Sequence, residues 1–249
     1  QANIFTRQFV HNMCSLQKKE KMSNYRRSAL IVGILFIIGT LSGILSGMIT
    51  SPMMGHAEFP LNLAAAETRW ILGTLLILVM GLPLAMIPAV LYPIFKKQNE
   101  TLAQGAVLFR GVLEAVCYLA LVACMLLMLS VGKLSLDQQA QQTITTLLTN
   151  ATDWIELLLA IVFSIGSLMI SVLLYQMRLV PRWLSGWGIV GAVLYFIAPF
   201  FSLLFHQHPA FGFESWIGFL IGPLAVQEMF FAVWVIIKGF NPPLLKNMP

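Results

Sequence analysis

The sequence predicts an all-α fold, a polytopic integral membrane bundle of six transmembrane helices. Of the 249 residues, 58% are hydrophobic and only 10% are charged, whereas about a quarter of the residues in an ordinary soluble domain are charged. Apolar runs of about 20 residues, the length that crosses a bilayer, recur along the whole chain. The connections between these runs are too short to form a separate soluble domain of ordinary size.

Six apolar runs are long enough to span a membrane. We expect them at residues 28–51, 70–95, 102–132, 152–177, 184–205 and 216–238. The first run is too long for the core of a cleaved signal peptide, so we expect it to be retained. The predicted domains are a basic N-terminal segment, the membrane domain and a short tail, at residues 1–27, 28–239 and 240–249. Met22 resembles a natural start, so residues 1–21 are expected to be an appendage, either on the membrane surface or disordered.

Two connections are expected to contain short helices of their own on the outer side. The loop from Pro52 to Arg69 contains an A-A-A-E run, and the polar segment from Ser135 to Asn150 is rich in glutamine. Alanine, glutamate and glutamine all have high helix propensity. The sequence therefore predicts short outer helices after the first and third spans.

The basic residues predict the orientation of the bundle. Twelve of the fifteen lysines and arginines fall on one side: Arg7, Lys18, Lys19, Lys21, Arg26, Arg27, Lys96, Lys97, Arg178, Arg182, Lys238 and Lys246. The opposite side has Arg69 and Lys133 but six acidic residues: Glu58, Glu67, Asp137, Asp153, Glu156 and Glu214. By the positive-inside rule, both termini are expected in the cytoplasm. Because the basic residues lie beside apolar spans, the net charge of +5 does not indicate nucleic-acid binding.

Two stripes of small or polar residues indicate close helix contacts. Gly39, Gly43 and Gly47 repeat every four residues in the first span, a spacing that lets helices approach closely. This stripe could pack inside the bundle, or it could dock a partner subunit or a second copy of the chain. In the fourth span, hydroxyl groups follow helical spacing at Ser164, Ser167, Ser171 and Tyr175. We favour packing over a pocket lining for this second stripe.

Three charged residues lie at membrane depth. Arg110 lies about 12 Å from one end of the third span, Glu114 is one turn deeper, and Glu228 lies about 15 Å from the same surface on the sixth span. A charge near the middle of a span costs about 2.5–3.5 kcal/mol on insertion scales. We therefore expect these side chains to face inward, toward one another. Tyr118 is the nearest hydroxyl on the same stripe, whereas Gln227 is expected to point elsewhere.

Two hypotheses compete for this cluster. In the first, Arg110 clamps two helices through the two carboxylates and takes part in no chemistry. In the second, the cluster of Arg110, Glu114, Glu228 and Tyr118 binds a proton, a cation or a ligand amine, since it has one carboxylate more than it has basic groups. Intramembrane ionisable residues generally indicate function, and both hypotheses remain open at this stage.

Metal and catalytic signals are weak. His56, His206, His208, Glu58 and Glu214 fall in or beside two outer loops, but no flanking signature supports zinc binding. We expect no metal and no cofactor. The sequence has no G-x-S-x-G, H-E-x-x-H, P-loop or C-x-x-C motif, so known catalytic patterns are absent.

Four segments together resemble a known family. They are "VLYPIFKKQNE" at the end of the second span, "FRGVLEAV", "VPRWLSGWGIVGAVL" and "PLAVQEMFFAVWVIIKGF". Their order and spacing resemble a bacterial family of multi-pass membrane proteins catalogued as domain of unknown function 4386. The resemblance covers about residues 22–240 and implies a six-span protein of the bacterial inner membrane. It implies no activity.

The leading functional hypothesis is a membrane protein that binds or moves a small or lipid-like ligand, or a proton, through the polar core. Its expected partners are the lipid bilayer and a ligand in the bundle. A non-catalytic accessory or assembly subunit of a membrane complex is the alternative, and an intramembrane enzyme is the third hypothesis.

Overall fold

The computed structural model describes residues 2–54, 66–204 and 217–241, and every regular element in these ranges is helical. Within these ranges, six helices are long and apolar enough to cross a membrane. The chain thus has the organisation of a multi-pass membrane protein. The helical elements are α1 (Ala2–Met54), α2 (Glu67–Phe95), α3 (Glu100–Ala106), η1 (Val107–Leu113), α4 (Glu114–Gly132), α5 (Gln138–Met177), α6 (Arg182–Leu204) and α7 (Gly218–Ile237).

The six spans form a closed ring. Each span packs against its neighbours in sequence, and α7 packs against α1 to complete the circuit. The third span consists of α3, the π-helical segment η1 and α4, which follow one another without a break. Helices are the natural solution here because a bilayer offers no water to satisfy backbone groups, and a helix satisfies its own.

Local signals fix the ends of the helices. The side chain of Asn99 accepts a hydrogen bond from the Leu102 backbone N–H at 3.0 Å, and Asp137 accepts one from Ala140 at 3.2 Å. These are N-caps, which satisfy donors that a helix start leaves free. Helix α5 ends at Met177, and its C-cap Arg178 has a left-handed φ of 52°. Pro181 follows shortly after, as is common beyond a helix end.

The segment from Ser135 to Asn150 does not form a separate helix. Residues from Gln138 onward are the first turns of α5, which continues for 40 residues to Met177. Neither glycine nor proline occurs between Gln138 and Gly166, so nothing interrupts the helix. The short helix expected after the first span falls on residues 55–65, which lie outside the described residues.

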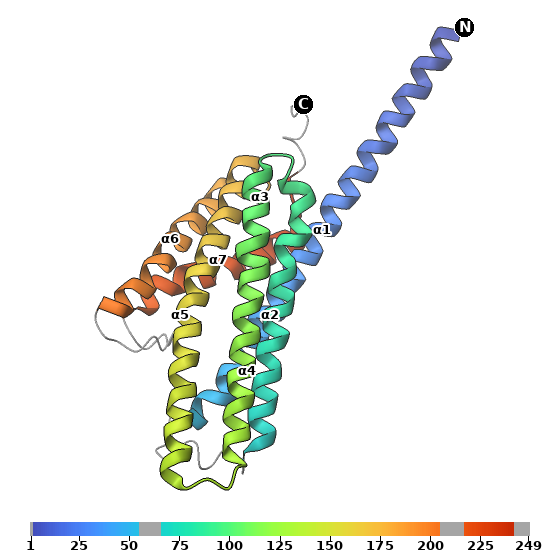
Figure 1. The fold of residues 1–249 in the computed structure, drawn as a ribbon. Coiled ribbons are helices and arrows are strands. Elements are labelled where there is room, and N and C mark those ends of the chain that lie inside the picture. Colours follow the sequence, from blue (N-terminus) through green and yellow to red (C-terminus); the bar gives the residue numbers. More distant parts are fainter. Residues whose placement is uncertain (1, 55–65, 205–216, 242–249) are drawn as a thin grey trace.

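Helix α1 is also longer than the predicted span. It begins at Ala2 and continues to Met54, so the N-terminal segment is a helical extension that projects away from the bundle (Figure 1). The basic N-terminal segment is thus continuous with the helix of the first span. This stretch contains no glycine or proline before Gly33, which permits an uninterrupted helix.

The two ends of the bundle differ in charge. We call the end with the connections 96–99 and 178–181 the basic end, because Lys96, Lys97 and Arg178 are exposed there. The other end, where α2 and α5 begin, is called the acidic end. Large exposed hydrophobic side chains occur on all the spans, for example Leu41, Leu82 and Leu119. The outer face of the ring is therefore apolar, as contact with lipid requires.

Candidate functional site

Arg110 lies in the π-helical segment of the third span. A π-helix bonds residues five apart instead of four, and such segments occur frequently at functional sites. Gly166 of α5 touches the Arg110 backbone so closely that a Cβ at this glycine would lie 2.7 Å from the Arg110 nitrogen. On the other side, a Cβ at Gly111 would lie 3.4 Å from the Ala85 carbonyl oxygen of α2. Two glycines thus hold the segment between α2 and α5.

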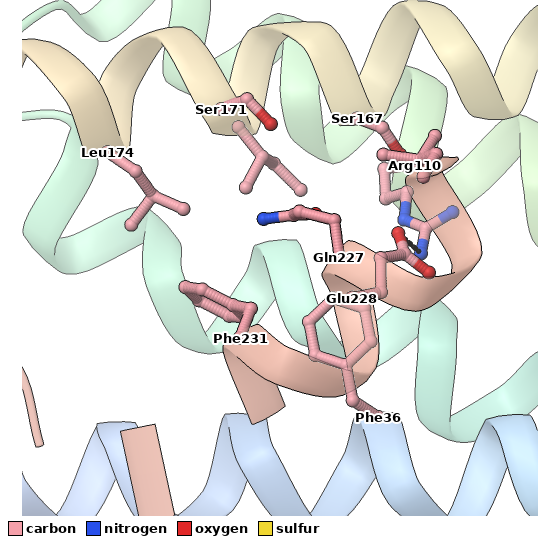
Figure 2. Close-up of a pocket in the computed structure, with 10 residues that line it drawn as sticks. Phe36, Arg110, Ser167, Ser171, Leu174, Gln227, Glu228 and Phe231 are labelled. Atoms are coloured by element: carbon pink, nitrogen blue, oxygen red, sulfur yellow. Dashed lines mark hydrogen bonds and ion pairs between the residues drawn. The ribbon is translucent and has the colours of Figure 1, made fainter. Parts of the chain in front are cut away.

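Two carboxylates from different helices contact the Arg110 guanidinium. Nη2 donates to Oε1 of Glu228 on α7 at 2.9 Å, and Nη1 donates to Oε1 of Glu114 at 3.3 Å. Figure 2 shows Arg110 and Glu228 pointing toward each other from the third span and α7. The side chains of Arg110 and Glu114 are fully buried, and that of Glu228 is 14% exposed. The structure therefore brings together the three charged residues singled out in the sequence.

Aromatic rings cover the guanidinium. The Arg110 Cζ atom lies 4.0 Å from the ring centroid of Phe163 on α5 and 5.9 Å from that of Phe36 on α1. A cation over an aromatic face is stabilised by the ring quadrupole, more strongly when water is excluded. The guanidinium is thus held by two carboxylates and two rings from four different spans.

Some polar atoms of this cluster lack a hydrogen bond. Arg110 Nε, Glu114 Oε2 and Ser167 Oγ are buried and make none with the described residues, although Oε2 lies 3.2 Å from Arg110 Nη1. Beside Arg110 and Glu228 lies a small cavity of about 20 Å³ that Ser167 also lines. A polar cavity of this size has room for one water. A bound water is a natural hydrogen-bond partner for Arg110 Nε and Ser167 Oγ, which both border this cavity.

Gln227 also lines the small cavity, contrary to the expectation that it points elsewhere (Figure 2). Its Nε2 donates to the Leu184 carbonyl oxygen of α6 at 3.1 Å, and a Cβ at Gly188 would lie 3.1 Å from the same nitrogen. Two adjacent residues of α7 share the cavity because the cavity extends along the helix toward the basic end. Gln227 therefore belongs to the polar core, next to Glu228.

The serine stripe of α5 divides between two roles. Ser167 and Ser171 line the small cavity together with Gln227, while the hydroxyl of Ser164 donates to the Ile161 carbonyl oxygen of its own helix. Tyr175 is 39% exposed and its ring lies 5.4 Å from the Arg182 guanidinium. Only the middle of the predicted stripe faces the polar core.

Tyr118 is buried and lines a second, larger cavity of about 210 Å³. The cavity wall also includes Phe163, Tyr195 of α6 and Glu156 of α5. Phe163 is therefore shared: it lines this cavity and also lies over Arg110. The charge pattern of the sequence groups Glu156 with the acidic residues of the outer side, whereas the structure places it on a cavity wall within α5.

Other predicted residues are placed as follows. A Cβ at Gly39 would meet the Leu84 side chain of α2 at 2.6 Å, and Gly43 faces Met80 of the same helix. Nothing lies within 4 Å of a Cβ at Gly47. Most of the glycine stripe thus packs inside the bundle, and docking of a partner stays a prediction for the stretch around Gly47.

The metal candidates His56, His206, His208, Glu58 and Glu214 lie outside the described residues. Within residues 2–54, 66–204 and 217–241, no group of three or more His, Cys, Asp or Glu residues is arranged to hold a metal ion.

A family model matches residues 31–239, which is most of the chain and includes all the charged residues of the polar core. The chain belongs to the family DUF4386. This family is described as a domain of unknown function. No curated protein and no solved structure matches the chain.

Proposed function

We propose that this DUF4386 protein moves protons through the polar core formed by Arg110, Glu114 and Glu228. One observation carries the proposal: two carboxylates share one buried guanidinium, and the cluster lies between two cavities. The small cavity contacts Glu228 and Arg110 on the side of the basic end. The larger cavity begins at Tyr118, two helical turns beyond Arg110 toward the acidic end.

The charge count favours a proton as the species that is exchanged. With both carboxylates ionised, the cluster has one negative charge that the guanidinium does not neutralise. An unpaired charge in a low-dielectric interior costs several kcal/mol. A proton on either Glu114 or Glu228 removes this cost, and the two sites are joined through the same guanidinium. The cluster therefore supports loading and release of one proton.

Hydrogen-bonding groups on both sides of the cluster support a proton path. Ser167 and Gln227 lie on the small cavity, and Tyr118 and Glu156 lie on the larger one. Hydroxyl groups and water both donate and accept, as a proton relay requires. Phe163 separates the larger cavity from Arg110, so protons cross the cluster itself and not an open channel.

Proton flux into liposomes tests the proposal. The purified protein is reconstituted with an entrapped pH-sensitive dye, and a potassium diffusion potential drives the protons. We expect flux above that of protein-free liposomes, and its loss in Glu114→Gln and Glu228→Gln. Glu67→Gln, which changes an exposed carboxylate at the acidic end, is the control and keeps the flux. Flux equal to that of empty liposomes contradicts the proposal.

Thermal stability distinguishes this function from a purely structural clamp. If Glu228→Gln lowers the unfolding temperature but leaves proton flux unchanged, the cluster only holds α7 against the third span. Difference infrared spectroscopy in H₂O and D₂O measures the protonated carboxyl group directly. We expect one such band in the native protein and its loss in one of the two glutamine variants.

The proposed topology places both termini in the cytoplasm of a bacterial cell and the bundle in its inner membrane. The exposed lysines and arginines of the basic end support this orientation by the positive-inside rule. A fluorescent protein fused after the last residue is expected to fluoresce, whereas alkaline phosphatase at the same position is expected to be inactive. The opposite pattern contradicts the proposed orientation.

A further inference from the structure

The larger cavity has a composition different from that of the Arg110 cluster. It lies toward the acidic end, since Tyr118 follows Arg110 by eight residues and Glu156 precedes Gly166 by ten. At 1.5 Å per residue these separations are about 12 and 15 Å. The volume of about 210 Å³ exceeds that of the roughly 150 Å³ engineered cavity that binds benzene in another protein. The cavity thus has room for a small organic molecule.

Glu156 is the one acidic side chain on the wall of this cavity. Among the described residues, no basic side chain forms an ion pair with Glu156. The other polar groups on the wall are the phenols of Tyr118 and Tyr195, and the remaining wall is apolar or aromatic. An ionised carboxylate in such surroundings is costly unless it has a positive partner, and without one it takes up a proton.

Three aromatic rings from three spans face the same space. Tyr118 belongs to α4, Phe163 to α5 and Tyr195 to α6, and all three line the cavity. The rings of Phe163 and Tyr195 are 4.8 Å apart and inclined at 51° to each other. Differently oriented rings around a carboxylate resemble the cages that proteins use for ammonium groups, which combine cation–π attraction with a counter-charge.

We propose that this cavity binds a small organic cation through Glu156 and the three aromatic rings. A metal ion is disfavoured because calcium requires six to eight oxygen ligands, whereas the wall offers one carboxylate and two phenols. A neutral apolar ligand leaves Glu156 without a partner. The cavity shares Tyr118 and Glu156 with the proposed proton path, but the inference does not depend on proton movement, because its test measures the binding of a cation and not flux.

Choline and its neutral isostere 3,3-dimethylbutan-1-ol provide matched probes, because they share a shape and differ in charge. Isothermal titration calorimetry of the full chain in detergent measures both. We expect choline to bind at least about tenfold more tightly than the alcohol, given the strength of a desolvated cation–π contact. Equal binding of the two, or binding of neither, overturns the proposal.

Two variants test the location of the site. Glu156→Gln keeps the shape of the side chain, and we expect it to weaken choline binding at least about tenfold. Ala160→Leu keeps the carboxylate but fills part of the cavity, since Ala160 is buried on its wall; we expect it to abolish binding. Glu67→Gln is the control and binds as the native protein does. Native binding by both test variants, each with a native unfolding temperature, overturns the assignment.

Discussion

Among the described residues, two ion pairs join different spans, one in the middle of the membrane and one at the acidic end. Arg110 contacts Glu228 at 2.9 Å, and neither side chain is more than 14% exposed. Lys133, which follows α4, contacts Glu67 at the start of α2 at 2.5 Å, with side chains 50% and 39% exposed. The exposed pair is the shorter of the two.

The distance between the charged atoms does not by itself rank the contributions of these pairs to stability, because each contribution also depends on how well water solvates the charges. An exposed pair gains little, since water and salt screen its charges; measured values are about 0.2–1 kcal/mol. In the buried pair, removing one partner leaves a charge that nothing solvates, at a cost of about 3–5 kcal/mol. The comparison therefore predicts a large difference between matched substitutions at the two sites.

The largest effect is expected from Arg110→Met. This change leaves Glu114 and Glu228 buried without a counter-charge, so the free energy of unfolding falls by about 3–5 kcal/mol. Denaturant unfolding in a fixed detergent measures it. Adding Glu114→Gln and Glu228→Gln to the same protein removes the stranded charges and should recover most of the loss. No recovery in the triple variant shows that the loss comes from packing alone.

Gly166→Ala is expected to have the next largest effect. The added Cβ would lie 2.7 Å from both the nitrogen and the Cβ of Arg110. Because backbone has to move, unfolding free energy should fall by about 1–3 kcal/mol. The matched control is Gly186→Ala, also in a helix, where nothing lies within 4 Å. The control should be neutral or stabilise by up to about 1 kcal/mol; equal losses in both variants contradict the close packing described above.

Arg26→Ala is expected to have an effect on stability between the effects at the buried and the exposed ion pair. Arg26 donates to the carbonyl oxygens of Val235 and Ile236, at 3.4 and 2.7 Å, near the end of α7. A cation at a helix C-terminus interacts favourably with the helix dipole, and we expect a loss of about 0.5–1.5 kcal/mol. Arg27→Ala removes a neighbouring exposed charge as the control. Thermal unfolding of the two variants in the same detergent distinguishes capping from general charge loss.

Glu67→Gln should have the smallest effect, below about 1 kcal/mol. Since the pair is exposed, added salt should reduce even this difference. Unfolding measured at low and at high salt tests both expectations. A loss of unfolding free energy comparable to that of Arg110→Met would contradict the predicted difference between the buried and the exposed ion pair.

Most of the fold was predictable from the sequence because lipid imposes a simple rule. Each span must be a helix of about 20 apolar residues, and the predicted six spans overlap the six observed helices. The meeting of Arg110 with Glu114 and Glu228 was also predictable, since burying each charge requires a partner at the same depth. The depth of each charged residue in its span, counted along the sequence, supplied that information without any knowledge of tertiary structure.

Other features depend on packing that hydropathy does not record. The π-helical segment around Arg110 changes hydrogen-bond register without changing composition. The charge pattern groups Glu156 with the acidic residues of the outer side, yet α5 begins at Gln138 and carries it along the wall of the bundle. Gln227 reaches the small cavity because that cavity extends along α7. The helical face of Glu228 at its own depth in the membrane does not reveal this extension.

The π-helical turn in the third span also determines how α4 is rotated about the helix axis relative to α3. A single residue corresponds to about 100° around an α-helix, so deleting one residue from Val107–Leu113 would return the segment toward α-helical spacing. Helix α3 would keep its packing against α5, whereas Glu114 and Tyr118 would rotate together about the helix axis. The Glu114 carboxylate of the cluster and the Tyr118 phenol of the larger cavity therefore rotate together with α4, and neither can change direction without the other.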